Sequence, residues 1–195
     1  MMLRSITKHS EPAQWFDVNC AFEDDMATML LDHFPAEYTV NYTGGRECTN
    51  NFRKFITRET TPELAKVFAE WDTQAAREYF STISGTDCTE TKLRIELCQD
   101  GPGFYLDQHI DIKEKLFTML IYLGDGNQNW GTSIYNDDHS YFGSTKFAHN
   151  TGWMTTSDSQ LWHGVPKSVN IDERLRHSIM INYVAGNWKD VHQLY

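Results

Sequence analysis

The segment TKLRIELCQDGPGFYLDQHID, residues 91–111, is the most informative stretch for the fold class of this chain. In its first part the apolar residues Leu93, Ile95 and Leu97 alternate with polar ones, a period of two that is typical of a half-buried β-strand. A Gly-Pro-Gly turn at 101–103 follows, and a second strand-like run continues to the end of the segment. The segment therefore predicts the start of a series of short strands.

Further strands are expected on the C-terminal side of this segment and helices on its N-terminal side. The strand-like runs lie at 116–123, 131–135, 162–163 and 176–184. Helices are expected at 23–33 and at 61–85, where Thr61 suits an N-cap and Pro62 the first helical position. Because neither helix carries clustered ligands, we interpret both as core helices on one face of a sheet. The pattern predicts a mainly β fold with supporting α-helices, a sandwich or a barrel.

The composition restricts the partners of the protein. A chain of 195 residues suits one domain with a sizeable core. The net charge of −10 repels phosphate groups, which argues against nucleic acid and anionic membranes as partners. No stretch approaches the roughly 20 apolar residues of a membrane helix. The four cysteines form no C-x-x-C pair, and reduced thiols are the simplest interpretation, so we expect a cytoplasmic protein.

His109 and Asp111 are the first candidates for chemistry. Residues i and i+2 of a strand project to the same face. Both side chains can then reach one metal ion at about 2.0–2.2 Å, as metal–nitrogen and metal–oxygen bonds require. A His-x-Asp pair is weak evidence by itself, because a chain of this composition contains such pairs by chance.

His163 and the pair formed by Arg176 and Ser178 are the other candidates. A histidine at a strand end fits a pocket lining, although a structural histidine is the alternative. An arginine and a serine two residues apart on a strand can bind one carboxylate, because the guanidinium fork takes both oxygens and the hydroxyl adds a donor. The alternative is an edge strand with a solvated polar face.

The combination is more specific than its parts. His163 follows Asp111 by 52 residues, and Arg176 follows His163 by 13. Two histidines and one carboxylate form the facial triad that holds non-haem Fe(II) and leaves coordination positions open.

With these residues in this order, the sequence resembles the Fe(II)/2-oxoglutarate-dependent dioxygenases, most closely their prolyl-4-hydroxylase-like branch. The resemblance covers roughly residues 91–185 and rests on the segments 103–111, 118–123, 130–132, 163–166 and 176–178. It implies a double-stranded β-helix, a cupin-like jelly roll with N-terminal helices packed on one sheet. In that reading 1–195 is a single domain, with 1–90 a helical support region with edge strands and 91–185 the catalytic core.

The resemblance also implies roles for particular residues. The matched metal ligands are His109, Asp111 and His163. Arg176 and Ser178 match the pair that holds the distal carboxylate of 2-oxoglutarate, and Tyr122 matches a tyrosine whose hydroxyl reaches the same carboxylate. Arg174 has the same strand parity, but Arg176 is preferred because Ser178 completes the Arg-x-Ser pattern. The implied cofactors are Fe(II), the cosubstrate 2-oxoglutarate and O2.

The implied reaction is hydroxylation of an unactivated C–H bond, and the carboxylate of Asp111 argues against halogenation. A small molecule such as a free amino acid is the expected substrate, because Arg94 and Glu96 share one strand face and can pair with its carboxylate and ammonium groups. If that face meets solvent, they are surface charges instead. Trp130 is a candidate for an aromatic pocket wall or for core packing.

Other readings of the chain stay open. A prolyl or other residue of a peptide or protein is the competing substrate. A cupin-like metal-dependent isomerase and a non-catalytic binding module are the alternatives of other classes, and the sequence does not indicate an oligomeric state.

Overall fold

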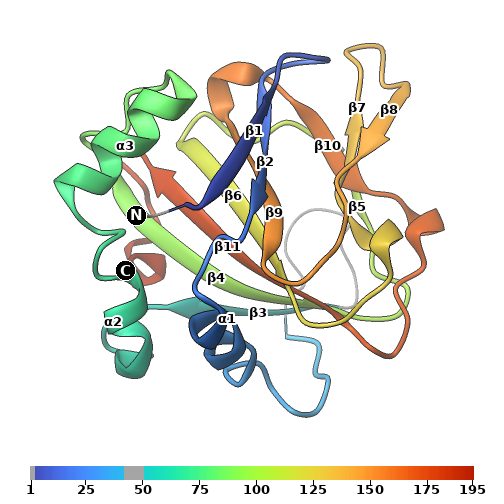
Figure 1. Cartoon of the computed structure of the whole chain (residues 1–195), viewed down its shortest axis with the longest axis horizontal. Helices are drawn as coiled ribbons and strands as arrows, with labels where there is room; N and C mark the ends of the chain where they lie inside the picture. Colours follow the sequence, from blue (N-terminus) through green and yellow to red (C-terminus); the bar gives the residue numbers. More distant parts are fainter. Residues whose placement is uncertain (1–2, 42–50) are drawn as a thin grey trace.

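The computed structural model describes residues 3–41 and 51–195. Within these residues, seven strands form one large antiparallel sheet (Figure 1). In spatial order they are β1 (Ser5–His9), β2 (Trp15–Asn19), β9 (Thr151–Thr156), β6 (Lys115–Leu123), β11 (Arg176–Val184), β4 (Lys92–Asp100) and β3 (Asn51–Ile56).

A smaller sheet faces the large one. Its strands are β5 (Leu106–His109), β10 (Trp162–Val165), β7 (Ser133–Tyr135) and β8 (Tyr141–Ser144), all paired antiparallel. The chain crosses repeatedly between the two sheets, since β4 is followed by β5, β6 by β7, and β10 by β11. The expected mainly β fold, a jelly roll with helices against one sheet, is confirmed.

Two apolar layers follow from the strand alternation. Phe117, Met119 and Ile121 of β6 pack on the helix side of the large sheet, in one cluster with residues of the helices. Leu120 and Tyr122 of the same strand belong to a second cluster, shared with residues of the small sheet. Burial on both faces explains why β6 reads as a near-continuous apolar run.

Helices cover the outer face of the large sheet (Figure 1). They are α1 (Asp24–Leu31), α2 (Ala65–Phe68) and α3 (Gln74–Ser84), with short 3-10 turns at Pro62–Leu64, Gln128–Trp130, Ser157–Ser159, Lys167–Val169 and Val191–Gln193. No helix among the described residues has the length and apolar character needed to cross a bilayer.

The expectation of one continuous helix over 61–85 is wrong. The chain leaves helical geometry after Phe68 and restarts at α3, where the Thr73 hydroxyl accepts a hydrogen bond from the backbone N–H of Ala76. Asp72, within the break, receives hydrogen bonds from Arg58 and Arg77, which anchor the interruption. Gly85, with a φ of 80°, ends α3 as expected.

Candidate metal centre and its pocket

His109, Asp111 and His163 converge in the space between the sheets. Their potential ligand atoms all lie within 4.8 Å of one another, close enough for one metal ion to bind all three. His109 and His163 are direct partners in the β5–β10 pairing, and their ring centroids are 4.3 Å apart. Residues 54 positions apart in the sequence thus meet through antiparallel pairing alone.

Asp111 lies just beyond the strand that carries His109. Strand β5 ends at His109, so the expected strand up to residue 111 is shorter than predicted, and Asp111 lies in the loop before the turn at 113–114. The side chains of His109 and Asp111 still reach the same point, as the sequence predicted. Thr118 of β6 holds the Asp111 carboxylate there by a hydrogen bond.

Both imidazoles are oriented by backbone carbonyls. Nδ1 of His109 lies 2.8 Å from the carbonyl oxygen of Asp107, and Nδ1 of His163 lies 2.9 Å from that of Leu161. A carbonyl oxygen only accepts, so each Nδ1 carries the proton and a neutral ring has its lone pair on Nε2. This is the tautomer that a metal ligand with an outer hydrogen-bond partner requires.

Asp111 is held ionised. Thr118 Oγ1 donates to one carboxylate oxygen at 2.7 Å, and Lys115 Nζ lies 3.1 Å from the other. Burial by itself raises the pKa of this carboxyl, but Lys115, His163 and the Thr118 hydrogen bond outweigh it and hold the pKa well below its usual range. The site therefore offers two neutral nitrogens and one anionic oxygen.

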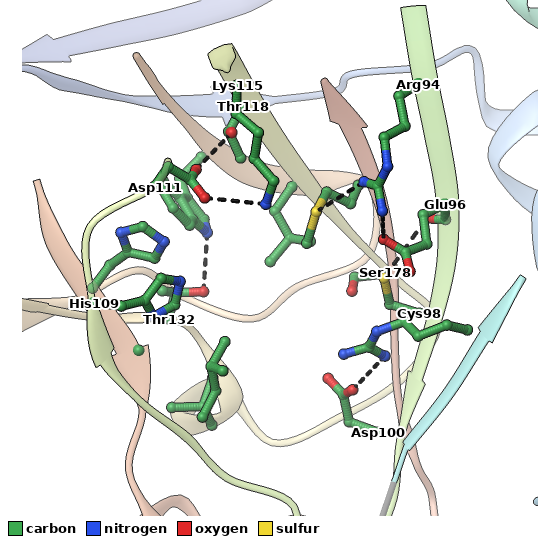
Figure 2. A pocket seen from close by; sticks show the side chains of 18 of the residues that line it. Arg94, Glu96, Cys98, Asp100, His109, Asp111, Lys115, Thr118, Thr132 and Ser178 are labelled. Carbon is green, nitrogen blue, oxygen red and sulfur yellow. Dashed lines mark hydrogen bonds and ion pairs between the residues drawn. The ribbon is translucent and has the colours of Figure 1, made fainter. Parts of the chain in front are cut away.

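The three side chains line a cavity of about 530 Å³, within the range of small-molecule pockets. Its other wall is the inner face of the large sheet. Side chains stand there in rows fixed by the strand register: Thr118, Asn182 and Arg94 in one row, and Ser178, Cys98 and Arg53 in another. Figure 2 shows the labelled β4 residues on one side of the pocket, with His109 and Asp111 on the other.

At one end of this wall lies Arg176, whose side chain is 3% exposed. It donates from Nη1 to Asp100 Oδ2 at 2.6 Å and from Nε to the carbonyl oxygen of Trp130 at 2.7 Å. Ser178 also lines the pocket, and its buried hydroxyl has no hydrogen-bond partner among the described residues. A buried hydroxyl without a partner, close to a cationic group, indicates a site where an anionic ligand would accept its hydrogen bond.

Arg174 lies elsewhere. It is an exposed residue that pairs with Asp172 and whose guanidinium lies 5.0 Å from the Trp130 ring centroid. Strand β11 begins only at Arg176, after Leu175, which has a positive φ of 62°. Of the two candidate arginines, the structure places Arg176 in the pocket wall.

Arg94 and Glu96 face the pocket and not solvent. Both are buried and line the cavity, and Arg94 Nη2 donates to Glu96 Oε2 at 2.9 Å. Arg94 also donates to Asn182 and to Gln193, a residue of the C-terminal turn that closes this end. The sequence left open whether Arg94 and Glu96 face the pocket or solvent, and in the structure they face the pocket.

Tyr122 and Trp130 lie behind the wall, since the described residues that line the cavity include neither. The Tyr122 hydroxyl is 2.9 Å from Thr132 Oγ1 and 2.7 Å from Thr145 Oγ1. Trp130 is buried in the apolar cluster between the sheets. A direct role of either residue in ligand binding stays a prediction.

Sequence reasoning missed several lining residues: Arg53, Asp100, Trp188 and Gln193. The sequence pattern could have indicated Asp100, because the alternation from Arg94 continues through Cys98 to Asp100 on the same strand face. The pattern could not have indicated Arg53, because β3 shows no regular alternation. Its position beside β4 depends on pairing between distant parts of the chain.

The fold has close counterparts among solved structures. A prolyl-4-hydroxylase from Pseudomonas putida superposes with a TM-score of 0.62 at 13% identity, over 89% of this chain and 94% of that one. A prolyl hydroxylase from Trichoplax adhaerens, solved with a hypoxia inducible factor peptide fragment, gives 0.64 at 13% identity, over 89% and 84%. A 2OG-Fe(II) oxygenase family structure from Burkholderia pseudomallei gives 0.61 at 14%, over 87% and 84%.

No protein-family model matches the sequence, and no curated protein matches it. The likeness therefore lies in the fold, which is that of the Fe(II)/2-oxoglutarate oxygenases. The similar structures include a prolyl-4-hydroxylase and a prolyl hydroxylase. Since one fold hosts many activities, the function has to be argued from the site itself.

Proposed function

We propose that the protein is an Fe(II)- and 2-oxoglutarate-dependent dioxygenase that hydroxylates an unactivated C–H bond. The observation that carries this proposal is the convergence of His109, Asp111 and His163 within 4.8 Å, in a cavity that also contains Arg176. A metal site and a cationic group in the same pocket suit a chelating ligand with a second carboxylate.

The donor set fits Fe(II). Two imidazole nitrogens from His109 and His163 and one carboxylate oxygen from Asp111 would hold the ion and would leave coordination positions for further ligands. When bound, Fe(II) with 2-oxoglutarate and O2 supplies the oxidising chemistry, which yields succinate, CO2 and a hydroxylated product. The chain's own task is to orient these ligands and to exclude water.

Each neighbouring residue has a task in this proposal. Thr118 and Lys115 hold the carboxylate of Asp111 by hydrogen bonds to its two oxygens. Arg176 and Ser178 bind the distal carboxylate of 2-oxoglutarate, with the unsatisfied Ser178 hydroxyl as a donor. The Tyr122 hydroxyl is still expected to reach the same carboxylate, and it lies 2.9 Å from Oγ1 of Thr132, which lines the pocket.

The test is the absorbance of the protein mixed with Fe(II) and 2-oxoglutarate without oxygen. We expect the weak visible charge-transfer band of the chelate, and its loss in Asp111→Asn. Asp138→Asn, on an exposed turn, is the matched control and should keep the band. If the intact protein shows no band but binds zinc tightly, a cupin-like isomerase replaces the oxygenase.

For the substrate we propose a small molecule, such as a free amino acid or a derivative. The buried Arg94 and Glu96 support this, because a cation and an anion in one pocket match the carboxylate and ammonium of a zwitterion. The competing substrate is a peptidyl residue. The prolyl hydroxylase from Trichoplax adhaerens was solved with a peptide fragment, so its fold is compatible with that class.

A screen of free amino acids against peptides separates the two substrate classes. The readouts are succinate release and a mass gain of one oxygen. Arg94→Ala should weaken binding of the amino acid while uncoupled turnover of 2-oxoglutarate continues. Unchanged substrate affinity in that variant would count against the amino-acid proposal.

Two further expectations stay predictions. One is the division into a support region over 1–90 and a catalytic core over 91–185. The other is the cytoplasmic location, which fractionation of cells that produce the protein would check.

A further inference from the structure

Asp100 joins two arginines at one end of the pocket. Arg53 Nη1 donates to Asp100 Oδ1 at 2.8 Å, and Arg176 Nη1 donates to Asp100 Oδ2 at 2.6 Å. The exposed fractions of the three side chains are 11% for Arg53, 0% for Asp100 and 3% for Arg176. Arg53 comes from β3, the edge strand that pairs with β4, and it lines the same cavity as Arg176.

The charges of this Arg53–Asp100–Arg176 unit do not cancel. Two guanidinium groups and one carboxylate leave one positive charge in a buried place, which is costly unless an anion pairs with it. Burial lowers the pKa of Arg53, but Asp100 and Glu96 help to outweigh it, and the pKa lies above its ordinary value. The unit is therefore cationic, and it balances the charge of one bound carboxylate.

Hydrogen-bond donors remain around the unit. The described side-chain hydrogen bonds of Arg53 both use Nη1, whereas a guanidinium carries five N–H donors over three nitrogens. The unsatisfied hydroxyl of Ser178 stands in the same row as Arg53, with Cys98 between them. Neighbouring strands are about 4.8 Å apart, so the backbones of Arg53 and Ser178, two strands apart, are separated by about 10 Å. A side chain as long as arginine and a carboxylate bound at Ser178 together span this separation.

We propose that Arg53 is a second arginine of the cosubstrate site. It binds the distal carboxylate of 2-oxoglutarate together with Arg176 and Ser178, and Asp100 fixes the spacing of the two guanidinium groups. This inference rests on the proposed oxygenase function. It assigns a binding task to a residue of the N-terminal half, outside the segment 91–185 whose sequence resembles the oxygenases.

A consequence concerns which 2-oxo acids the site accepts. Arg53 contacts only the distal carboxylate, so it should distinguish 2-oxoglutarate from 2-oxopentanoate, which has the same chain length but lacks that group. The chelating end of both compounds is identical. Loss of Arg53 should therefore weaken binding of the first and leave binding of the second unchanged.

The experiment compares Arg53→Gln with Lys54→Gln in the full chain. Lys54 is the next residue of β3, and adjacent strand residues point to opposite faces, so it is a matched loss of charge outside the pocket. Mn(II) replaces iron so that no turnover occurs. Titration calorimetry then gives the dissociation constants of Mn(II), of 2-oxoglutarate and of 2-oxopentanoate for each protein.

In Arg53→Gln we expect the dissociation constant of 2-oxoglutarate to rise at least tenfold. The constants for Mn(II) and 2-oxopentanoate should not change, and Lys54→Gln should match the wild type. If Arg53→Gln binds 2-oxoglutarate as the wild type does, the inference is overturned while the oxygenase proposal stands. If the wild type binds Mn(II) but not 2-oxoglutarate, both fail.

Arg53→Lys covers the case in which the glutamine variant does not fold. Lysine keeps the charge, but its single ammonium group cannot reproduce the planar fork that serves Asp100 and a ligand together. We expect a several-fold weaker affinity for 2-oxoglutarate with an unchanged circular dichroism spectrum. If Arg53→Lys binds 2-oxoglutarate as tightly as the wild type does, a positive charge alone suffices. That result would contradict the proposal that the guanidinium contacts Asp100 and the ligand at the same time.

Discussion

Cys98 lies between two ion pairs on the pocket wall, one formed by Arg94 and Glu96 and the other by Arg53 and Asp100. Burial raises the pKa of its thiol to about 12, and the opposing effects of the two arginines do not outweigh burial together with the carboxylates of Glu96 and Asp100. The thiol therefore stays protonated at neutral pH. It fills space between charged groups and is a poor nucleophile.

We predict that alkylation distinguishes the described cysteines. At pH 8 iodoacetamide should modify the exposed Cys20 readily, while Cys98 and Cys88, whose thiol pKa is raised to about 11 by burial, should react only after unfolding. Because the thiol pKa values of Cys98 and Cys88 lie well above 8, only a small fraction of these two thiols is ionised at that pH. Peptide mass mapping before and after denaturation is the measurement, and rapid modification of Cys98 in the folded protein would contradict it.

At the scale of elements, strands β6, β11 and β4 each contribute one residue to a chain of hydrogen bonds. Arg94 Nη1 donates to Asn182 Oδ1 at 2.8 Å, Asn182 Nδ2 donates to Thr118 Oγ1 at 2.9 Å, and Thr118 Oγ1 donates to Asp111 Oδ2 at 2.7 Å. The strand register aligns the first three in one row. All bonds run in one direction, so they polarise each other and fix the carboxylate orientation.

Removal of the middle of this chain should affect the metal site. We predict that Asn182→Ala weakens Mn(II) binding about tenfold, the lower end of the effect of losing a residue that supports a ligand. It should also lower the free energy of unfolding by about 1–3 kcal/mol, because buried partners lose a bond. Electron paramagnetic resonance of free Mn(II) measures the first effect.

The exposed Asn187→Ala is the control for both measurements. Unchanged Mn(II) affinity in Asn182→Ala, with stability reduced, would mean that the chain of hydrogen bonds serves the sheet alone. In that case Thr118 would hold Asp111 without help from β11.

Strand β9 approaches β6 so closely that only glycine fits at one position. A Cβ on Gly152 would lie 1.9 Å from the Leu120 carbonyl oxygen, whereas a Cβ on Gly143 of β8 would meet nothing within 4 Å. We predict that Gly152→Ala lowers the free energy of unfolding by about 1–3 kcal/mol or more. Gly143→Ala should stay within about 0.5 kcal/mol of the wild type. Urea denaturation measures both, and equal stabilities would contradict the close approach.

At the scale of the whole molecule, the pocket is a region where side chains do not fill the space between the two sheets. A ligand bound there contacts both sheets and stabilises the folded state by mass action. We predict that Mn(II) with 2-oxoglutarate at about 100 times its dissociation constant raises the melting temperature by about 5–10 °C. Differential scanning calorimetry measures this shift.

The variant Asp111→Asn serves as the control for this effect. It should lose most of the shift, because 2-oxoglutarate chelates the ion that Asp111 helps to hold. An equal shift in this variant would show that the compounds bind elsewhere on the protein.

The sequence predicted well those elements whose pattern is local. Strand β11 was expected at 176–184 and occupies Arg176–Val184, and β6 was expected at 116–123 and occupies Lys115–Leu123. Strand β9 was missed, since its segment is buried on almost every residue and shows no alternation. The break between α2 and α3 was missed because the apolar spacing continues through Trp71, which is buried in the same core.

Local strand alternation was enough to indicate which residues of β4 and of β11 share a face, because alternation depends only on the backbone of one strand. The order of His109, Asp111, His163 and Arg176, together with the family resemblance, named them as candidates for one site. Their arrangement in space came only from the folded chain, in which Asp111 approaches the histidines from the loop after β5 and Arg53 joins Arg176 through Asp100. Such placements depend on which strands pair across long separations, and the local pattern of side chains does not encode this choice.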